Sequence, residues 1–377
     1  MKPQARLLSQ IALASFATTC AFTVCAQSSV TIYGVFDAGV EANDSGRGTT
    51  ERVISGGAVG SRLGFRGAED LGGGASALFR LEQGFAGDDG TLAQGGRAFG
   101  REATVGLGKR GLGIVTLGRT PTPVSTMQSY VDAFAWMGSG GFISLTRSGT
   151  VSRQVIPQVV NARVDNAIQY SAPVIANTET RLLFAPGEGQ VDVGRNFGAS
   201  ARYTKAPFDL VAAFGRQDGA GRAGGRIVSF TVGGSYDFKP FKLYAGVTNE
   251  QNSCSTCVGS LARQTGVTGG NASEFRLFNI GMRYPVGAFT AIAQVVRVDD
   301  RSKYAVNPGD RDATWVAIGA EYALSKRTIL YGALGSIDNQ NGSQYALGSG
   351  GVQRPAGAVA AGDPRSTTAT LGMRHSF

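Results

Sequence analysis

Hydrophobic and polar side chains alternate along most of the chain, in short stretches that come in pairs. A period of two places every second side chain on the same face of a β-strand. In residues 75–85, Phe79 and Leu81 share one parity, while Arg80 and Glu82 occupy the other. The alternation therefore predicts β-strands that have one apolar face and one polar face.

The stretches are connected in a regular way. Seven pairs are joined by short turns, and one more stretch stands at each end, so seven pairs plus two predict 16 strands. The segments between pairs are long and rich in Gly, Asn, Asp and Ser; these expected loops are residues 42–57, 86–96, 120–164, 187–195, 217–225, 251–273, 300–312 and 338–366. Successive strands of a meander run in opposite directions, so all long loops fall on one side of the sheet. This polarity is typical of outer-membrane β-barrels, which have short periplasmic turns and long external loops.

The alternation continues to the last residue of the sequence. Residues 368–377 place Leu371 and Phe377 on an apolar parity. In lipid every backbone N–H and C=O must be satisfied within the protein, so a sheet can span the membrane only if it closes. We therefore expect the last strand to pair with the first, which begins at Val30. A barrel of about 16 strands is too wide for side chains to fill, so an aqueous lumen and diffusion of small solutes are expected.

The first 26 residues are typical of a cleaved secretory signal. Lys2 and Arg6 form a basic start, a moderately apolar stretch follows, and VCA at residues 24–26 supplies small side chains for cleavage. We expect the cut after Ala26 and one barrel domain over residues 27–377. A buried helix and a lipidated cysteine are less favoured interpretations of the same segment.

Charge and composition exclude several other classes. The net charge of +9 leaves +7 after the two signal charges are subtracted, and beyond the signal no uninterrupted run of 18 apolar residues suggests a membrane helix. GLGKRG at residues 106–111 fits G-x-G-x-x-G, but a strand rather than a helix follows it, which indicates a hairpin turn. The sole histidine, His375, argues against a histidine-based triad. No enzyme activity, cofactor, metal or nucleic-acid partner is expected.

Two competing interpretations place the chain in other classes of β protein. A surface adhesin or a plugged transporter would need a further domain ahead of the first strand at Val30. A soluble sugar-binding sandwich would not need loops of one length class on one side of its sheet.

Cys254 and Cys257 form a C-x-x-C pair in the sixth expected loop. A zinc site would need two more Cys or His ligands, and the only histidine is His375. A small loop disulfide is the favoured interpretation, ahead of two free thiols and of redox chemistry.

Several segments resemble the general trimeric porins of beta-proteobacteria, of the Neisseria and Burkholderia type. These segments are SSVTIYGVFDAGV, GSRLGFRGAEDLGGGASALFRLEQGF, GIVTLGR, GAEYALSKRT and LGMRHSF. The resemblance implies a 16-stranded barrel, a homotrimer, and a third long loop, between Arg119 and Asp165, that folds into the lumen. It also implies an outer-membrane location among lipids and lipopolysaccharide, and recognition of Phe377 by the barrel assembly machinery. The cysteine pair and Arg80 depart from the family pattern.

Fixed charges in a pore set which ions enter it. The candidate constriction and selectivity residues are Arg62, Arg66, Arg80, Arg101, Arg119, Glu82 and Asp132. Their alternative role is to solvate a wet wall or to pair with carboxylates at the rim. Together with the net positive charge, these arginines predict a weak preference for anions.

The arrangement of these charges can also be predicted. Arg62, Arg66 and Arg80 lie on the lumen parity of adjacent strands, where residues across the ladder are about 5 Å apart, so they would form a positive stripe. We expect Glu82 to pair with one of these arginines and to weaken the stripe. We expect Asp132, in the third loop, to face the stripe across the narrowest part of the pore.

Overall fold

The computed structural model describes most of the chain after the predicted signal. The described residues are 29–44, 48–147, 153–154, 162–187, 194–219, 225–253, 273–301, 312–341, 343, 345–348 and 365–377. The signal segment 1–26, Cys254 and Cys257 lie outside these residues.

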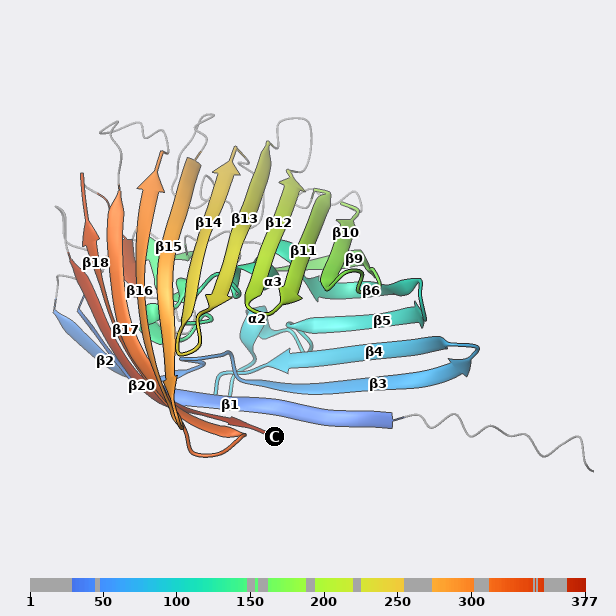
Figure 1. The fold of residues 1–377 in the computed structure, drawn as a ribbon, viewed down its shortest axis with the longest axis horizontal. Helices are drawn as coiled ribbons and strands as arrows, with labels where there is room; N and C mark the ends of the chain where they lie inside the picture. Colours follow the sequence, from blue (N-terminus) through green and yellow to red (C-terminus); the bar gives the residue numbers. More distant parts are fainter. Residues whose placement is uncertain are drawn as a thin grey trace, which may run out of the picture.

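The described chain is a closed antiparallel β-barrel, and Figure 1 shows its strands following one another around the wall. The strands are β1 (Ser29–Asp44), β2 (Thr49–Ser55), β3 (Arg62–Gly72), β4 (Ala75–Gly84), β5 (Glu102–Lys109), β6 (Gly113–Pro121), β7 (Leu145–Arg147), β8 (Arg153–Gln154), β9 (Arg163–Ser171), β10 (Thr178–Ala185), β11 (Asn196–Lys205), β12 (Phe208–Asp218), β13 (Arg226–Asp237), β14 (Lys242–Asn252), β15 (Ser273–Val286), β16 (Phe289–Asp300), β17 (Ala313–Ala323), β18 (Thr328–Asn339), β19 (Tyr345–Leu347) and β20 (Ser366–Ser376). Short helical segments are α2 (Ala93–Gly96), α3 (Pro123–Gln128), η1 (Gly138–Gly140) and η2 (Phe142–Ser144). Among the described residues, no helix is long and apolar enough to cross a membrane.

The last strand closes the barrel onto the first. β20 pairs with β18 on one side and with β1 on the other, from Val35↔Ser376 to Asp44↔Thr367. The sheet has 17 strands by hydrogen bonding, but β2 and β3 both pair with β1 and together make one barrel strand. The described chain therefore forms the predicted barrel of 16 strands.

The bounds of the predicted first loop, 42–57, are wrong, although the connection between β1 and β2 falls within them. β1 continues to Asp44 and β2 already begins at Thr49, whereas the chain leaves the ladder later, at residues 56–61. The buried carboxylate of Asp37 explains this position, because it accepts hydrogen bonds from the backbone N–H groups of Ala58 (3.1 Å) and Val59 (2.9 Å). The polar composition of β2, which suggested a loop, is satisfied by pairing across the strands.

The outer face of the wall is apolar, as the alternation predicts. On β12, Phe208, Leu210 and Phe214 are 44%, 46% and 44% exposed, whereas Val211 and Ala213 between them are buried. A water-soluble protein would not leave such a face open over every strand, but hydrocarbon solvates it. In the middle of β12 the inward residues Val211 and Ala213 are apolar as well, which differs from the expected polar lumen face.

The third loop explains these apolar inward residues. It leaves β6, enters the barrel and returns at β9, and Figure 1 shows α3 inside the wall. α3 contacts β10–β13, and η1 contacts β17, β18 and β20. Loop residues such as Val131, Phe134 and Met137 form one hydrophobic cluster with inward wall residues such as Trp315 and Ile337. The main core of this barrel therefore lies between a loop and the inner wall.

Glycines on the inner wall let the loop approach closely. A Cβ on Gly281 would lie 2.5 Å from Cβ of Ala133, and one on Gly246 would lie 2.7 Å from Cβ of Val131. The glycines that meet the loop in this way are Gly198, Gly215, Gly233, Gly246, Gly281, Gly319 and Gly335. Side chains at these positions would push the loop off the wall, so the row of glycines sets how far the loop intrudes into the lumen.

Candidate functional site: the basic wall of the lumen

The strands on the side of the barrel opposite the third loop carry an array of arginines. The barrel order places β3, β4 and β5 across the lumen from β14 and β15. The arginines of this basic wall, which spans β3–β6, β9, β10 and the loop before β5, are Arg62, Arg66, Arg80, Arg97, Arg101, Arg119, Arg163 and Arg181. Most of those within strands lie on the parity opposite to the apolar outer face, whereas Arg119 follows an irregularity at residues 118–120 that shifts the register of β6.

A cluster of charges surrounds Glu82. Its carboxylate accepts a hydrogen bond from Arg101 Nε (2.6 Å) and another from the Tyr33 hydroxyl (3.0 Å), and it lies 3.6 Å from Arg62. The expected pairing of Glu82 with an arginine is thus present, and it involves two arginines. Arg163 joins the cluster, because its Nε donates to the backbone carbonyl of Arg101 (2.9 Å).

Arg66 and Arg80 lie closer to the turn between β3 and β4. They are direct partners across the ladder, as the sequence predicted. Arg80 Nη1 lies 3.2 Å from Glu102, while the guanidinium of Arg66 lies over the ring of Tyr33, 5.4 Å from its centroid. A polar bay of about 370 Å³ opens here, and its lining includes Arg66, Arg80 and Arg181. Two arginines directly opposite each other repel, so this bay is a region of positive potential.

Asp165 holds a third group of charges. Its carboxylate accepts from Arg119 Nη1 at 2.5 Å and from Arg97 Nη1 at 2.8 Å. Arg119 also donates from Nε to the backbone carbonyl of Gly100 (2.7 Å), which fixes its side chain against the wall. Arg119 is thus part of the basic wall, although a carboxylate balances part of its charge.

The wall remains net positive after these pairings. Its four carboxylates, Glu82, Glu102, Glu179 and Asp165, face eight arginines. Arg66 makes no ion pair with any residue that the structure describes. Lumen water therefore meets an excess of guanidinium groups along this side.

Asp132 does not face this wall, which corrects the sequence expectation. Its side chain is fully buried within the third loop, so it cannot present a carboxylate to lumen water. It accepts hydrogen bonds from the backbone N–H groups of Phe134 (3.0 Å), Trp136 (2.9 Å) and Phe142 (2.9 Å), and from Gln294 Nε2 (3.0 Å). Burial raises the pKa of the Asp132 carboxyl above its ordinary value. Its role is to fold the loop and to attach it to β16.

The third loop therefore brings no exposed acid to the lumen. Asp132 is the only Asp or Glu in the sequence of residues 120–162, and it is buried. The expected electric field across the pore, between an acidic loop and the basic wall, is therefore not formed. The positive potential of the wall is instead left without an acidic counterpart on the loop.

Sequence reasoning missed several members of the wall. Arg97, Arg163, Arg181, Glu102 and Asp165 were not singled out, although REATV at residues 101–105 and RVDNA at residues 163–167 carry charges at strand starts. Each of these two stretches follows a long loop and begins a strand. Their matching positions would have indicated that their charged side chains lie at the same height on the barrel wall. By contrast, nothing local to the sequence indicated that Arg163 would meet Arg101.

One further inward arginine, on the strand next to β10 of the basic wall, is neutralised. Arg202, on β11, makes two hydrogen bonds with the carboxylate of Asp209, at 2.9 and 2.8 Å. Its guanidinium also stacks on Tyr130 of the third loop, 3.8 Å from the ring centroid. Arg202 thus supports the loop and adds no net charge to the pore.

A closed barrel with an apolar exterior, a charged inner wall and a loop folded inside defines a membrane channel protein. The sequence profile of the Gram-negative porin family matches residues 12–342, and the chain belongs to this family. It is an outer-membrane porin, a water-filled channel through which small hydrophilic solutes and ions diffuse. The resemblance noted in the sequence is thereby confirmed.

Individual relatives agree with this assignment. The chain is 32% identical to outer membrane porin protein 32 of Delftia acidovorans over 379 residues, covering 98% of this chain and 99% of the relative. It is 24% identical to major outer membrane protein P.IB of Neisseria lactamica, covering 96% and 98% of the two chains. Among solved structures it is similar to the anion-selective porin from Comamonas acidovorans, with a TM-score of 0.77, 29% identity, and coverage of 93% and 100%. The trimer form of OmpT from Vibrio cholerae shares the fold, with a TM-score of 0.64, 15% identity, and coverage of 93% and 99%.

Proposed function

We propose that this porin admits small anions in preference to small cations. The observation that carries the proposal is the excess of arginines over carboxylates on the basic wall, facing a third loop whose one acid is buried. Fixed positive charges on a pore wall raise the local concentration of anions and lower that of cations. The printed description of the Comamonas acidovorans structure as anion-selective supports the same assignment.

Zero-current potentials across a gradient of KCl test this proposal directly. We expect the wild-type protein in a planar bilayer to give the sign of an anion-selective pore. Arg62→Gln and Arg101→Gln, combined, remove two charges beside Glu82 and should reduce the anion preference severalfold. Arg66→Glu is a second, independent variant at a side chain that makes no ion pair. It tests the proposal even if the double variant Arg62→Gln/Arg101→Gln fails to fold.

Arg202→Gln combined with Asp209→Asn is the matched control, because it removes an inward arginine together with the carboxylate that neutralises it and leaves the net charge of the lumen unchanged. It should change the potential least of all these variants. A wild-type pore that prefers cations, or a potential that neither Arg62→Gln/Arg101→Gln nor Arg66→Glu alters, would refute the proposal.

We further propose that the functional unit is a homotrimer. This rests on the family resemblance and on the trimer form of OmpT, which shares the fold. Native mass spectrometry of the detergent-solubilised protein should give three chains. Bilayer insertions should then close in three equal steps under high voltage, whereas single-step closure of a monomeric species would contradict this assembly.

We also propose that residues 1–26 are removed on export and that the barrel assembly machinery recognises the C-terminal strand. The basic start and the VCA at residues 24–26 support the first part. N-terminal sequencing of protein from isolated outer membranes should begin at Gln27. A mature protein that retains Met1 would show that the segment is not a cleaved signal.

A further inference from the structure

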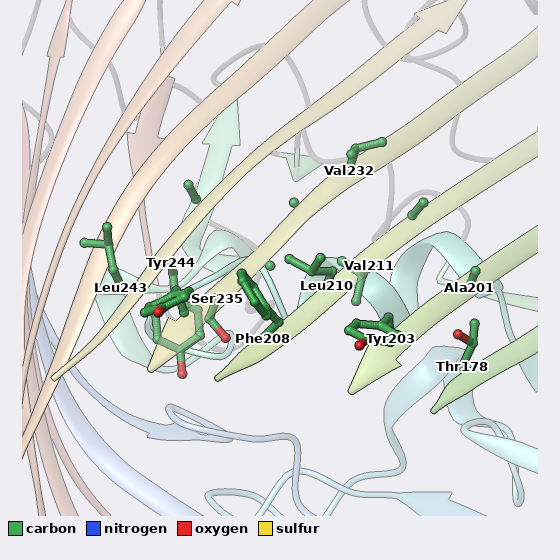
Figure 2. A pocket seen from close by; sticks show the side chains of 15 residues that line it. Thr178, Ala201, Tyr203, Phe208, Leu210, Val211, Val232, Ser235, Leu243 and Tyr244 are labelled. Atoms are coloured by element: carbon green, nitrogen blue, oxygen red, sulfur yellow. The ribbon is translucent and has the colours of Figure 1, made fainter. Parts of the chain in front are cut away.

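The outer face of the barrel is not uniformly convex. A groove of about 610 Å³ crosses β10–β14 on the lipid-facing side (Figure 2). The outward side chains and glycine that define this lipid-facing groove are Thr178, Ala201, Tyr203, Phe208, Leu210, Ala212, Val232, Gly234, Tyr236, Leu243 and Ala245. Its volume lies within the range of sites that bind small molecules, about 300–1,000 Å³.

Small residues form the floor of the groove. Ala201 pairs with Ala212 across the ladder, and Gly234 pairs with Ala245. A Cβ at Gly234 would collide with the backbone carbonyl of Asp209, and the φ of Gly234 is +149°, so glycine is required by the strand itself. Larger side chains stand above this floor on both sides. The floor therefore runs obliquely across four strands. Its long, narrow shape matches that of a single extended hydrocarbon chain.

The groove is apolar, and aromatic rings mark one end of it. Phe208 packs edge-on against Tyr236, with centroids 5.0 Å apart, and Tyr236 packs against Phe238 at 4.5 Å. These rings lie beside the short turns at Ala206-Pro207 and residues 238–241, which form the periplasmic side of the barrel. Aromatic side chains favour this level of a membrane, where hydrocarbon meets headgroups.

Two lysines stand at the same end of the groove. Lys205, which pairs with Phe208, and Lys239, in the turn beside Phe238, are both exposed. Of the nearby carboxylates, Asp209 binds Arg202 inside the barrel, whereas the exposed Asp237 accepts the backbone N–H of Lys239 in the same turn, so the two lysines exceed the one exposed carboxylate. The headgroup end of the groove is therefore positively charged, and it complements a phosphate.

We propose that the lipid-facing groove binds one anionic glycerophospholipid of the periplasmic leaflet. One acyl chain lies along Ala201, Ala212, Gly234 and Ala245, and the phosphate lies between Lys205 and Lys239. This inference goes beyond ion passage and does not depend on selectivity. A second copy of the chain is the competing occupant, and it would need to cover an outward face that carries two exposed lysines.

Native mass spectrometry with defined lipids tests the proposal. The assembled protein is purified in detergent, and either dioleoylphosphatidylglycerol or dioleoylphosphatidylcholine is added at equal concentration. We expect the phosphatidylglycerol to remain bound severalfold more than the phosphatidylcholine. Ala212→Phe fills the floor and should abolish retention of both lipids. Lys205→Glu combined with Lys239→Glu should remove the preference for phosphatidylglycerol while leaving apolar binding.

Matched controls make the same changes away from the groove. Ala320→Phe enlarges an outward residue of β17, and Lys326→Glu reverses an exposed lysine in the turn between β17 and β18. Both should retain lipid like the wild type, and heat-modifiable mobility on a gel should verify that each variant is folded. Equal retention by all variants would overturn the proposal. If Ala212→Phe dissociates the oligomer but retains lipid like the wild type, the groove is instead an interface with a second copy of this chain.

Discussion

At the scale of single residues, Glu82 is the most informative charge in the lumen. It lies between Arg62 and Arg101, and its side chain is only slightly exposed to water. A carboxylate in that position neutralises part of the basic wall where the wall is most crowded. It also holds Arg101 in place, so its removal affects both the charge and the geometry of the cluster.

We expect Glu82→Gln to raise the anion preference of the pore. The amide can still accept a hydrogen bond from Arg101 and from Tyr33, while the opposing charge is lost. The permeability ratio of anions to cations should rise roughly two- to fivefold, because a partly screened charge is worth about 0.5–1 kcal/mol. Asp89→Asn makes the same change of net charge on an exposed external loop and should leave the ratio unchanged. A ratio that falls in Glu82→Gln would show that the carboxylate itself does not oppose anions.

Asp132 is a buried acid whose protonation is linked to folding. Burial raises the pKa of its carboxyl above the ordinary value of 3.8, so the folded protein binds this proton more tightly than the unfolded chain does. The stability that this proton contributes is complete below pH 3.8 and is lost as the pH rises through the raised pKa. Asn at this position cannot titrate.

The stability lost in Asp132→Asn should therefore depend on pH. We expect the Tm of the wild type to exceed that of Asp132→Asn most near pH 3. This difference should shrink as the pH rises toward about 7, because a carboxyl group with a raised pKa loses its proton over this range. Thermal melts in detergent, followed by circular dichroism at a series of pH values, measure the difference. A difference that stays constant or widens with pH would contradict the sign of this linkage.

At the scale of elements, the third loop is held to the wall by specific polar contacts as well as by its apolar core. Gln294 accepts from the N–H of Ala133 (2.8 Å), and Asn279 donates to the carbonyl of Val131 (2.6 Å). The loop's far end is fixed by the N–H of Gly138, which donates to the carbonyl of Gly57 (2.5 Å). The interrupted strand at residues 56–61 is thus part of the mechanism that positions the loop.

Gly281→Val should change the width of the pore through the loop. The position of its Cβ is only 2.5 Å from Cβ of Ala133, so the loop must move away from β15 and toward the basic wall. We expect a lower single-channel conductance in symmetric KCl, roughly by a third to a half, with overpacking costing about 1–3 kcal/mol of stability. Ala291→Val, which enlarges an outward side chain on β16, is the control. An unchanged conductance in Gly281→Val would show that the loop does not set the pore width.

The elements were largely predictable from the sequence because strand alternation and loop length are local signals. The expected loop 300–312 matches the end of β16 at Asp300 and the start of β17 at Ala313. The bounds of the first loop were wrong because Asp37 fixes residues 56–61 through contacts with a neighbouring strand, 21 and 22 positions away in the chain. Asp132 was misassigned for the same reason, since its partner Gln294 lies 162 positions further along the chain. Contacts between distant segments leave no local pattern.

At the scale of the whole molecule, closure of the barrel depends on the ends of the described chain. Phe377 exchanges two backbone hydrogen bonds with Gly34, at 3.0 and 3.1 Å, and its ring covers the space where a Gly34 side chain would stand. The ring itself is half exposed on the outer face. Phe377 is therefore the last link of the seam, and its exposed ring is the group that we propose the assembly machinery recognises.

Deleting Phe377 should impair assembly in cells far more than it destabilises the folded barrel. Loss of two exposed backbone hydrogen bonds costs about 1–3 kcal/mol, which a barrel paired over ten residues on each side of β20 can tolerate. We therefore expect a fall of tenfold or so in outer-membrane yield, whereas protein refolded in detergent should melt only slightly earlier and conduct normally. Phe377→Tyr keeps both the ring and the backbone contacts and should restore the yield. Equal losses in cells and in detergent would mean that the residue acts through the seam alone, because a recognition signal has no effect once refolding proceeds without the assembly machinery.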